Sequence, residues 1–317
     1  MLWPFWKYAD YIRTHGRGGD QVFLLGPYSE PIDDENGSIM VAYHSMPRWM
    51  QQFDASFDDS DVSFRRNLHA YRVACRQYLD EVRTQFKLLK SSLMGKALLT
   101  EVRRTNKLVR IVPYWNFLKP SADASPWNGA SESAGGADVW IAATAKGAAA
   151  RLDRAGRPVI GSGAGTNAQI RYTPRMYHPG DGPGEAPDEV LFHELVHASR
   201  EMKGVFFRMP AGNGYEDLEE YIAIILCNIY LSEKRQEVFV GNHDGTMILR
   251  GADADNFIYN SQHVDTRATM VIQNFKDSQP DFYRDVVNLP PVRAKYNWVR
   301  QYDEEATRLW NQFHRPS

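Results

Sequence analysis

Hydrophobic and polar positions along the chain predict both long helices and short strands. Apolar residues recur at steps of three and four over Asp61–Lys90, which indicates a long amphipathic helix with one buried face. A second helix is predicted over Gly95–Arg104, and an alternating strand over Lys107–Val112. The segment Leu218–Leu231 is almost continuously apolar, so we expect a buried helix there.

Shorter strands are predicted at Val22–Leu25, Ile39–Tyr43 and Val139–Ala143. The rest of the stretch from 121 to 167 is rich in Ala, Gly and Ser and is interpreted as loops, with Gly161–Gly165 as a flexible turn. These glycines do not form a phosphate-binding motif, because no Lys-Ser/Thr follows them.

The stretch Ala168–Met176 alternates apolar and polar residues, which predicts a further strand. Pro174 has no N–H to donate to a neighbouring strand, so we expect this strand at an edge of its sheet. An extended peptide can add to such an edge by main-chain hydrogen bonds. Ile170 and Tyr172 are therefore candidate substrate-binding residues.

The central helix is predicted around Val190–Met202, which reads VLFHELVHASREM. Pro187 suits the first helical position, and Asp188 and Glu189 suit the positive N-terminal end of a helix. Gly204 is expected to end the helix.

This helix carries the motif His193-Glu194-x-x-His197. Residues i and i+4 lie on one face of a helix, so the two imidazoles can bind one zinc ion. Glu194 follows at about 100° round the helix, close enough to act as general base towards a zinc-bound water. The alternative interpretation is a pair of core or surface histidines without a metal.

A third zinc ligand is expected from the acidic start of the next helix. Glu220 is favoured, because the order Glu-x-x-Ala places a small residue one turn on and leaves room for the first helix. Glu219 is the substitute, and the carboxylate that does not bind zinc would hold a histidine in the right tautomer.

The residue that stabilises the oxyanion is less clearly marked. His243, in the turn GNHDGT, is a candidate hydrogen-bond donor that Asp244 would orient, and an exposed turn histidine explains it equally well. Further candidates for a role in the site are Tyr177, His178, Tyr296 and Arg300.

Composition narrows the class of protein. The 317 residues are 43% apolar and 24% charged, which is typical of a globular protein, and the net charge of -2 argues against a nucleic-acid partner. Two cysteines do not indicate a disulfide framework. No run approaches the ~20 apolar residues that a membrane span needs, and the N-terminus shows no signal-peptide pattern.

The sequence His193-Glu194-Leu195-Val196-His197-Ala198, followed by Glu219-Glu220, resembles the glutamate-ligand zincins. These include the clostridial neurotoxin light chains and the NleD-like effector metallopeptidases, and the closer resemblance is to the effectors. Gly95–Leu99 matches their Gly-x-x-Leu-Leu helix, and Tyr296–Arg300 stands where they often carry Phe-Asn-Pro-x-Arg, here without the proline. The resemblance covers about residues 91–300.

The resemblance implies an α+β, zincin-like fold, in which the edge strand of a small mixed sheet lines the cleft over the His-Glu-x-x-His helix. Residues 91–317 would form this catalytic domain, and residues 1–90 a mainly helical N-terminal region. It also implies a zinc endopeptidase with Zn2+ as cofactor, in agreement with His193, His197 and Glu220 as ligands and Glu194 as base.

The expected role is that of a bacterial effector or toxin. It would be made in the bacterial cytoplasm without a signal peptide, secreted or injected into a target cell, and directed at a protein there. A secretion machine and a cognate inhibitor are further expected partners. The alternatives are a zinc amidase that acts on cell-wall peptide and a zincin-shaped binding protein without turnover.

Overall fold

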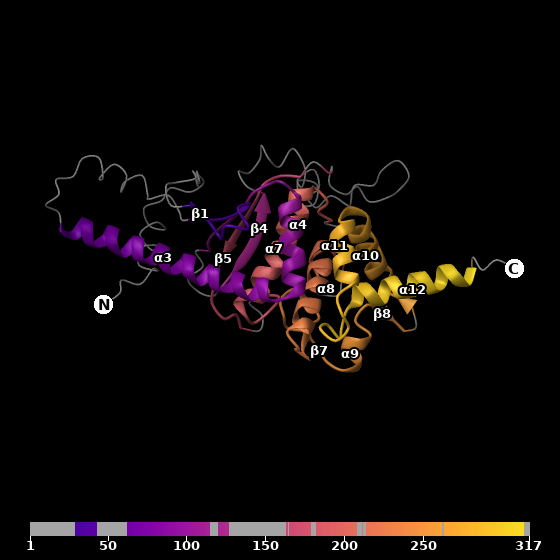
Figure 1. Cartoon of the computed structure of the whole chain (residues 1–317). Coiled ribbons are helices and arrows are strands. Elements are labelled where there is room, and N and C mark those ends of the chain that lie inside the picture. The colour runs from indigo at the N-terminus through magenta and orange to yellow at the C-terminus, as the bar shows by residue number, and fades with distance from the viewer. Residues whose placement is uncertain are drawn as a thin grey trace.

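A computed structural model describes residues 29–42, 62–114, 120–126, 163, 165–178, 182–207, 211, 214–261 and 263–313 (Figure 1). Within these ranges, the chain folds into a small mixed sheet and a group of helices, as expected for the α+β class. No helix in the described ranges is both long and apolar enough to cross a membrane.

The main sheet has five strands in the order β1-β2-β3-β5-β4. Its central strands β2, β3 and β5 run parallel, whereas β1 and β4 are antiparallel to their neighbours. The strands are β1 (Ser29–Pro31), β2 (Ile39–Ala42), β3 (Val109–Pro113), β4 (Ala122–Pro126) and β5 (Ala168–Tyr172). The strands predicted around Ile39, Lys107 and Ala168 are thus confirmed.

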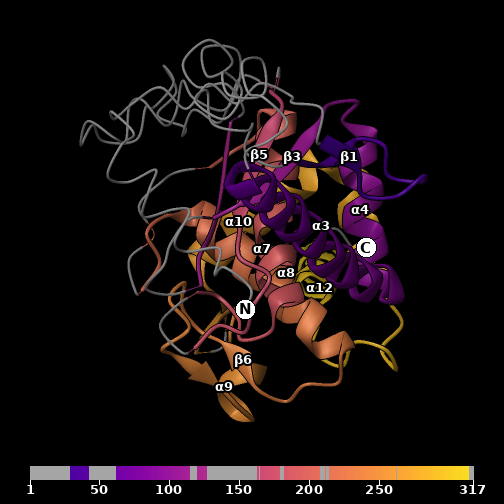
Figure 2. The same ribbon diagram turned by 90° about the vertical axis from the view of Figure 1, so that its left-hand side faces the viewer.

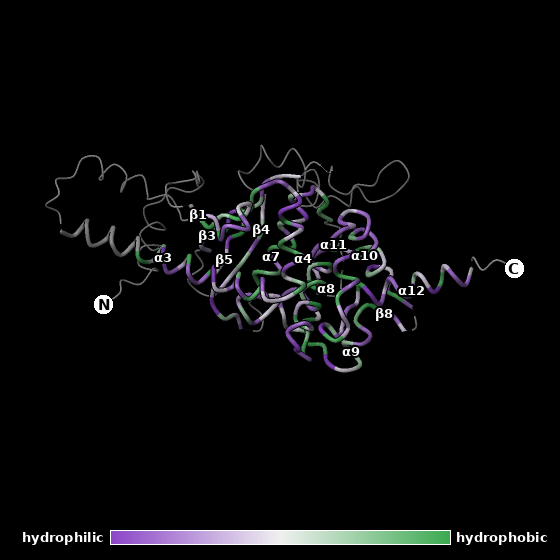
Figure 3. Tube along the Cα trace, in the orientation of Figure 1, coloured by the Kyte–Doolittle hydropathy of each residue, from purple (hydrophilic) through white to green (hydrophobic). Residues whose placement is uncertain are grey.

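Four helices build the centre of the molecule, and each was predicted from the apolar pattern. They are α3 (Val62–Ser91), α4 (Leu93–Arg104), α7 (Pro187–Lys203) and α8 (Leu218–Glu233). Helix α7 contacts β4 and β5 on one side and α8 on the other, and Figure 2 shows α7 and α8 next to each other behind α3. In Figure 3, hydrophobic residues concentrate along α8 and its neighbours, which matches its nearly complete burial.

The C-terminal part packs on the side of α8 and α4 that faces away from the sheet (Figure 1). Its helices are α9 (Ala252–Asp255), α10 (Thr266–Ser278), α11 (Pro280–Val287) and α12 (Trp298–Phe313). Two short hairpins accompany them, formed by β6 (Phe239–Val240) with β7 (Ile248–Leu249) and by β8 (Tyr259–Asn260) with β9 (His263–Val264).

The prediction that residues 168–176 form an edge strand is wrong. Strand β5 lies between β3 and β4, and β4 is the outer strand among the residues that the structure describes. The physical reason is that Pro174 lies beyond the last residue of β5, so its missing N–H removes no bond from the ladder. Ile170 and Tyr172 are fully buried, so they do not form the exposed edge on which their predicted role depended.

Several predictions concern residues outside the described ranges or are left open. The predicted strands Val22–Leu25 and Val139–Ala143 lie outside the described residues. In the predicted turn Gly161–Gly165, the two described glycines, at 163 and 165, both have positive φ. Apolar side chains of α3 between Cys75 and Leu89 belong to the same core as α7 and α8. The division after residue 90 remains a prediction.

Candidate metal centre

Helix α7 begins and ends where its sequence predicted. Pro187 is its first residue, and the Glu189 carboxylate accepts a hydrogen bond of 3.1 Å from the backbone N–H of Ala186, just before the helix. Gly204 ends the helix in the left-handed conformation, with φ of 68°, and its N–H donates to the carbonyls of Arg200 and Glu201. The histidines therefore stand on a well-defined helix that is buried on all sides.

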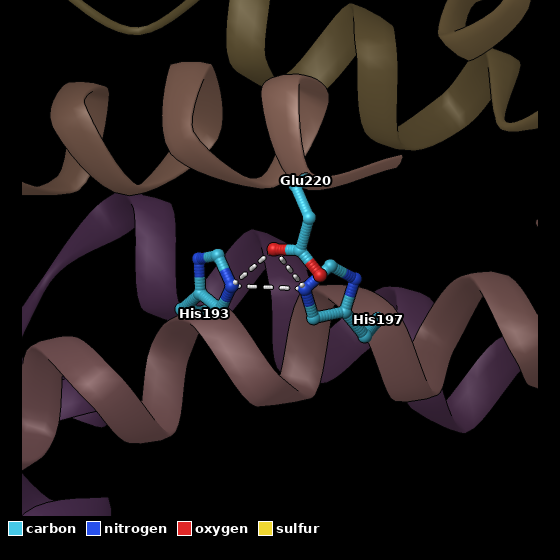
Figure 4. A group of neighbouring side chains, drawn as sticks. All are labelled: His193, His197 and Glu220. Atoms are coloured by element: carbon cyan, nitrogen blue, oxygen red, sulfur yellow. Dashed lines mark hydrogen bonds and ion pairs between the residues drawn. The ribbon is translucent and has the colours of Figure 1, made fainter. Parts of the chain in front are cut away.

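Helix α8 places its first turn opposite the histidines of α7. The carboxylate of Asp217 caps α8 by accepting a hydrogen bond of 3.0 Å from the backbone N–H of Glu220. This cap fixes the start of the helix, and with it the direction of the Glu220 side chain towards α7 (Figure 4).

His193, His197 and Glu220 converge in one cluster (Figure 4). The two Nε2 atoms lie 2.9 Å apart, and each lies 3.2 Å from Oε2 of Glu220. Both histidines are buried, and the Glu220 side chain is 14% exposed. Three metal-binding atoms from two helices thus point at one common position.

The cluster fits a zinc ion. Two imidazole nitrogens and a carboxylate oxygen are ligands that zinc takes, and in a tetrahedral site with bonds of about 2.0–2.1 Å the ligand atoms lie about 3.3 Å apart. The separations of 2.9 to 3.2 Å are close to that edge length. Burial and the neighbouring His197 lower the pKa of His193 to about 4, whereas the Glu220 and Glu219 carboxylates raise the pKa of His197 against its burial, so a metal ion would bind His193 as a neutral imidazole and displace a proton from His197.

Glu194 lies one residue beyond the first histidine and is also buried, with 5% of its surface exposed. Burial raises the pKa of its carboxyl group to about 8, against the lowering effects of His197 and of a backbone hydrogen bond from Ala124. Ala124 belongs to β4, so the outer strand of the sheet reaches the same side of α7 as this carboxylate. A carboxyl group with such a pKa can both accept and return a proton near neutral pH.

Glu219, the substitute ligand of the sequence analysis, points away from the Nε2 atoms. Its Oε1 accepts a hydrogen bond of 2.6 Å from Nε of Arg200, and its Oε2 accepts one of 2.8 Å from the backbone N–H of Phe207. Oε1 lies 3.6 Å from Nδ1 of His197, on the far side of that ring from Glu220. The structure therefore brings Glu220 to the metal position, and Glu219 behind one of the histidines.

His243 lies at the rim of the cluster, in the turn between β6 and β7. Its Nε2 is 3.4 Å from Oε2 of Glu220, and its ring centroid is 5.8 Å from that of His193. The side chain is 35% exposed, so it can meet a ligand from solvent. The sequence predicted that Asp244 orients this ring, but Oδ1 of Asp244 accepts hydrogen bonds from the backbone N–H and the hydroxyl of Thr246.

The remaining candidates have other contacts. The hydroxyl of buried Tyr177 donates to the carbonyl of Thr173, and His178 is exposed in the loop before α7. Tyr296 packs against the rings of Phe239 and Trp298.

The guanidinium of Arg300 donates to the carbonyls of Leu289 and Ala294. These contacts lie within the C-terminal part, so the structure does not bring Arg300 to the histidine cluster.

Two residues beside the cluster were not predicted from the sequence. Arg200 follows His197 by three positions on the same face of α7, which is a usable signal. Ala124 carries none, because Ala122–Pro126 shows no apolar alternation.

A protein-family model matches the part of the chain that carries this cluster. The family model Peptidase_M91, described as an effector protein, matches residues 70–236, which is more than half of the chain. The matched region includes α4, β3, β4, β5, α7 and α8, and it ends before His243. No curated protein matches the chain.

Proposed function

Because the chain belongs to the Peptidase_M91 family of effector proteins, a zincin-type metallopeptidase family, we propose that it is a zinc-dependent endopeptidase that cleaves a protein of a target cell. The observation that carries the proposal is the convergence of His193, His197 and Glu220 on one position, with the Glu194 carboxylate beside them. A purely structural zinc site is usually closed by a fourth protein ligand. Among the described residues, this cluster offers three.

His193, His197 and Glu220 would hold the zinc ion. When bound there, zinc supplies polarisation of a peptide carbonyl and a lowered pKa of water. The Glu194 carboxylate takes a proton from the attacking water and passes it to the nitrogen of the leaving amine. His243, at the exposed rim, donates a hydrogen bond to the oxyanion that develops on the carbonyl.

The substrate would add to β4 rather than to β5. The backbone N–H of Thr173 donates to the carbonyl of Ser121, just before β4. Backbone groups of an antiparallel strand face its neighbour at every second residue, so those of Asp123 and Ser125 also face β5. Ala122 and Ala124 consequently direct their backbone groups outward. Apart from the N–H of Ala124, which donates to the Glu194 carboxylate, the outward groups of this strand have no strand partner among the described residues, and an extended peptide paired with them would lie along the side of α7 that carries Glu194.

We further propose that the fold is zincin-like and that the protein is delivered to a target cell. The substrate edge over the metal helix is the arrangement expected of a zincin, with β4 in the place first assigned to β5. We propose that residues 91–317 carry catalysis and that α3 braces them through its apolar face. We also propose delivery by a secretion machine and control by a cognate inhibitor, and the match to an effector family supports secretion or injection.

The decisive experiment compares the wild-type protein with Glu194→Gln. Both are incubated with a lysate of target cells, and new protein N-termini are identified by mass spectrometry. We expect specific new N-termini only with the wild-type protein, because the amide cannot take the proton of the attacking water. Glu194→Gln should retain one zinc per chain.

Two outcomes contradict the proposal. Equal toxicity of wild type and Glu194→Gln in target cells would mean that binding, not cleavage, is the mechanism. Cleavage of purified cell-wall peptide, with no new protein N-termini in the lysate, would make the protein an amidase of non-protein substrates.

A further inference from the structure

We propose that Arg200 is a positioning residue of the metal centre, which acts through Glu219 to fix the ring of His197. The inference rests on the proposed zinc site and adds to it a chain of contacts behind one ligand. Arg200 stands on α7 one turn after His197, and its side chain is fully buried. A buried guanidinium needs every donor satisfied, so its contacts define its position closely.

The guanidinium of Arg200 is held from four directions. Its Nε donates to Oε1 of Glu219 at 2.6 Å, and its Nη1 donates to Oε1 of Gln279 at 3.2 Å. Its Nη2 donates to Oδ1 of Asn274 at 2.8 Å and to the carbonyl of Val205 at 3.0 Å. These partners come from α8, α10, the residue that precedes α11, and the loop after α7, so the guanidinium cannot move without breaking several bonds.

Arg200 and a backbone N–H together fix the Glu219 carboxylate. Oε1 faces Nε of Arg200, and Oε2 accepts the 2.8 Å hydrogen bond from Phe207 N–H. Because both oxygens have partners, the carboxylate cannot turn towards the Nε2 side of the histidines. This explains why two adjacent glutamates take different positions, with Glu220 at the cluster and Glu219 behind it.

The fixed carboxylate in turn orients His197. Oε1 of Glu219 lies 3.6 Å from Nδ1 of this ring, and Phe206 flanks the ring with centroids 5.8 Å apart. With Nδ1 held towards the carboxylate, Nε2 is directed at His193 and Glu220. The separation of 3.6 Å between Oε1 and Nδ1 is longer than a hydrogen bond, so the carboxylate faces the ring as a charged neighbour. Partners that do hydrogen-bond a metal-binding histidine typically change metal affinity about 10- to 100-fold when they are mutated.

A purely structural role is the competing explanation, because an Arg–Glu pair between two helices can simply join them. The chain offers a matched control for that role. Asp188 on α7 is buried and accepts a hydrogen bond of 2.8 Å from Lys234, just after α8, and another of 2.6 Å from Tyr230. This contact joins the same two helices near the other end of α7, and none of its partners touches the histidines.

The test measures zinc affinity of metal-free protein by competition with a chromophoric zinc chelator. The variants are Arg200→Lys, which keeps the buried charge but loses the planar fork, Glu219→Gln, the uncharged pair Arg200→Gln/Glu219→Gln, and Asp188→Asn. Thermal unfolding of each metal-free variant reports folding separately. Visible absorption of the cobalt-loaded proteins reports the geometry of the ligands, independently of activity.

We expect the zinc dissociation constant to rise about tenfold or more in the three Arg200 and Glu219 variants, with an altered cobalt spectrum. Asp188→Asn should lose thermal stability yet keep the wild-type zinc affinity and cobalt spectrum. If the folded Arg200 and Glu219 variants bind zinc within twofold of wild type, Arg200 is only structural and the inference is overturned. If the wild-type protein binds no zinc, the metal centre itself is overturned, and this inference with it.

Discussion

Oε2 of Glu220 lies 3.2 Å from Nε2 of His197, although the two residues belong to different helices. The contact makes the metal position a product of helix packing, since neither α7 nor α8 alone holds three ligands. Glu220 should therefore be the residue on which metal binding depends most strongly outside the histidine motif.

Replacement of Glu220 by Ala should abolish stoichiometric zinc binding. Two histidines would remain, which is one ligand short of the three that a catalytic zinc site uses. Zinc content after dialysis, measured by atomic emission, should fall from one per chain to almost none. Treatment of the wild-type protein with a chelator should abolish cleavage, and added zinc should restore it.

Glu216→Ala is the control for this change. Glu216 is an acidic residue four positions earlier, just before α8, but it is exposed and stands outside the cluster. Its loss should leave the zinc content at one per chain. Retention of zinc by Glu220→Ala would show that the third ligand is another residue.

The second prediction concerns the variant Ala124→Pro, which changes a backbone N–H on the outward side of β4. Proline removes the N–H that donates to the Glu194 carboxylate, but no ladder bond, because this N–H faces away from β5. Pro126 already occupies an equivalent outward position in the same strand, so the change is compatible with the strand. We expect kcat to fall about tenfold or more, because a base that is displaced by a fraction of an ångström transfers protons less well.

Ala122→Pro serves as the matched variant. It removes another outward N–H of β4, one that donates to no residue of the metal centre, so it should affect KM for a peptide substrate more than kcat. If the two proline variants lower kcat equally, the N–H of Ala124 does not position Glu194.

The amino-acid pattern predicted much of the framework around this site, for reasons that lie in single residues. Pro187 and Gly204 mark the ends of α7 by their backbone geometry, and the spacing of four residues alone puts both histidines on one face. The sequence could favour Glu220 over Glu219 as the third ligand but could not decide between them. The outcome depends on Arg200, Asn274 and Phe207, which the fold brings together from distant segments.

The outer strand of the sheet could not be predicted at all. Strand β4 consists of Ala, Asp and Ser with a final Pro, so it has neither apolar alternation nor β-branched residues. Its pairing with β5 is stabilised by cross-strand contacts such as the bidentate ion pair of Arg171 with Asp123. Pro174 was misleading because its position relative to the end of β5 is set by the fold.

The rim position of His243 leads to a third prediction. His243→Gln should lower kcat about 100-fold, since loss of one hydrogen bond to an oxyanion typically costs that much or more. KM and zinc content should stay close to those of the wild type, because the residue is not among the three clustered ligands. His178→Gln, a change of the exposed histidine before α7, is the control and should have wild-type kinetics. An unchanged kcat in His243→Gln would show that His243 does not stabilise the oxyanion.

The last prediction concerns the contact that ties the sheet to the end of the metal helix. Before β5, the N–H of Gly163 donates to the carbonyl of Gly204, and that of Thr166 donates to the carbonyl of Glu201. Between them, Gly165 has φ of +64°, and a Cβ placed on it would lie 1.8 Å from the carbonyl oxygen of Met202. That oxygen is part of α7 and cannot move without disturbing the helix.

Gly165→Ala should therefore lower the free energy of unfolding by about 3 kcal/mol or more, as measured by urea denaturation. Gly163→Ala is the matched control, because its φ of +77° is also left-handed but no atom of the described residues lies within 4 Å of the added Cβ. It should cost only the backbone strain of about 1–2 kcal/mol. If the two variants have equal stability, the segment can move away from Met202, and β5 is not fixed to the end of α7 in this way.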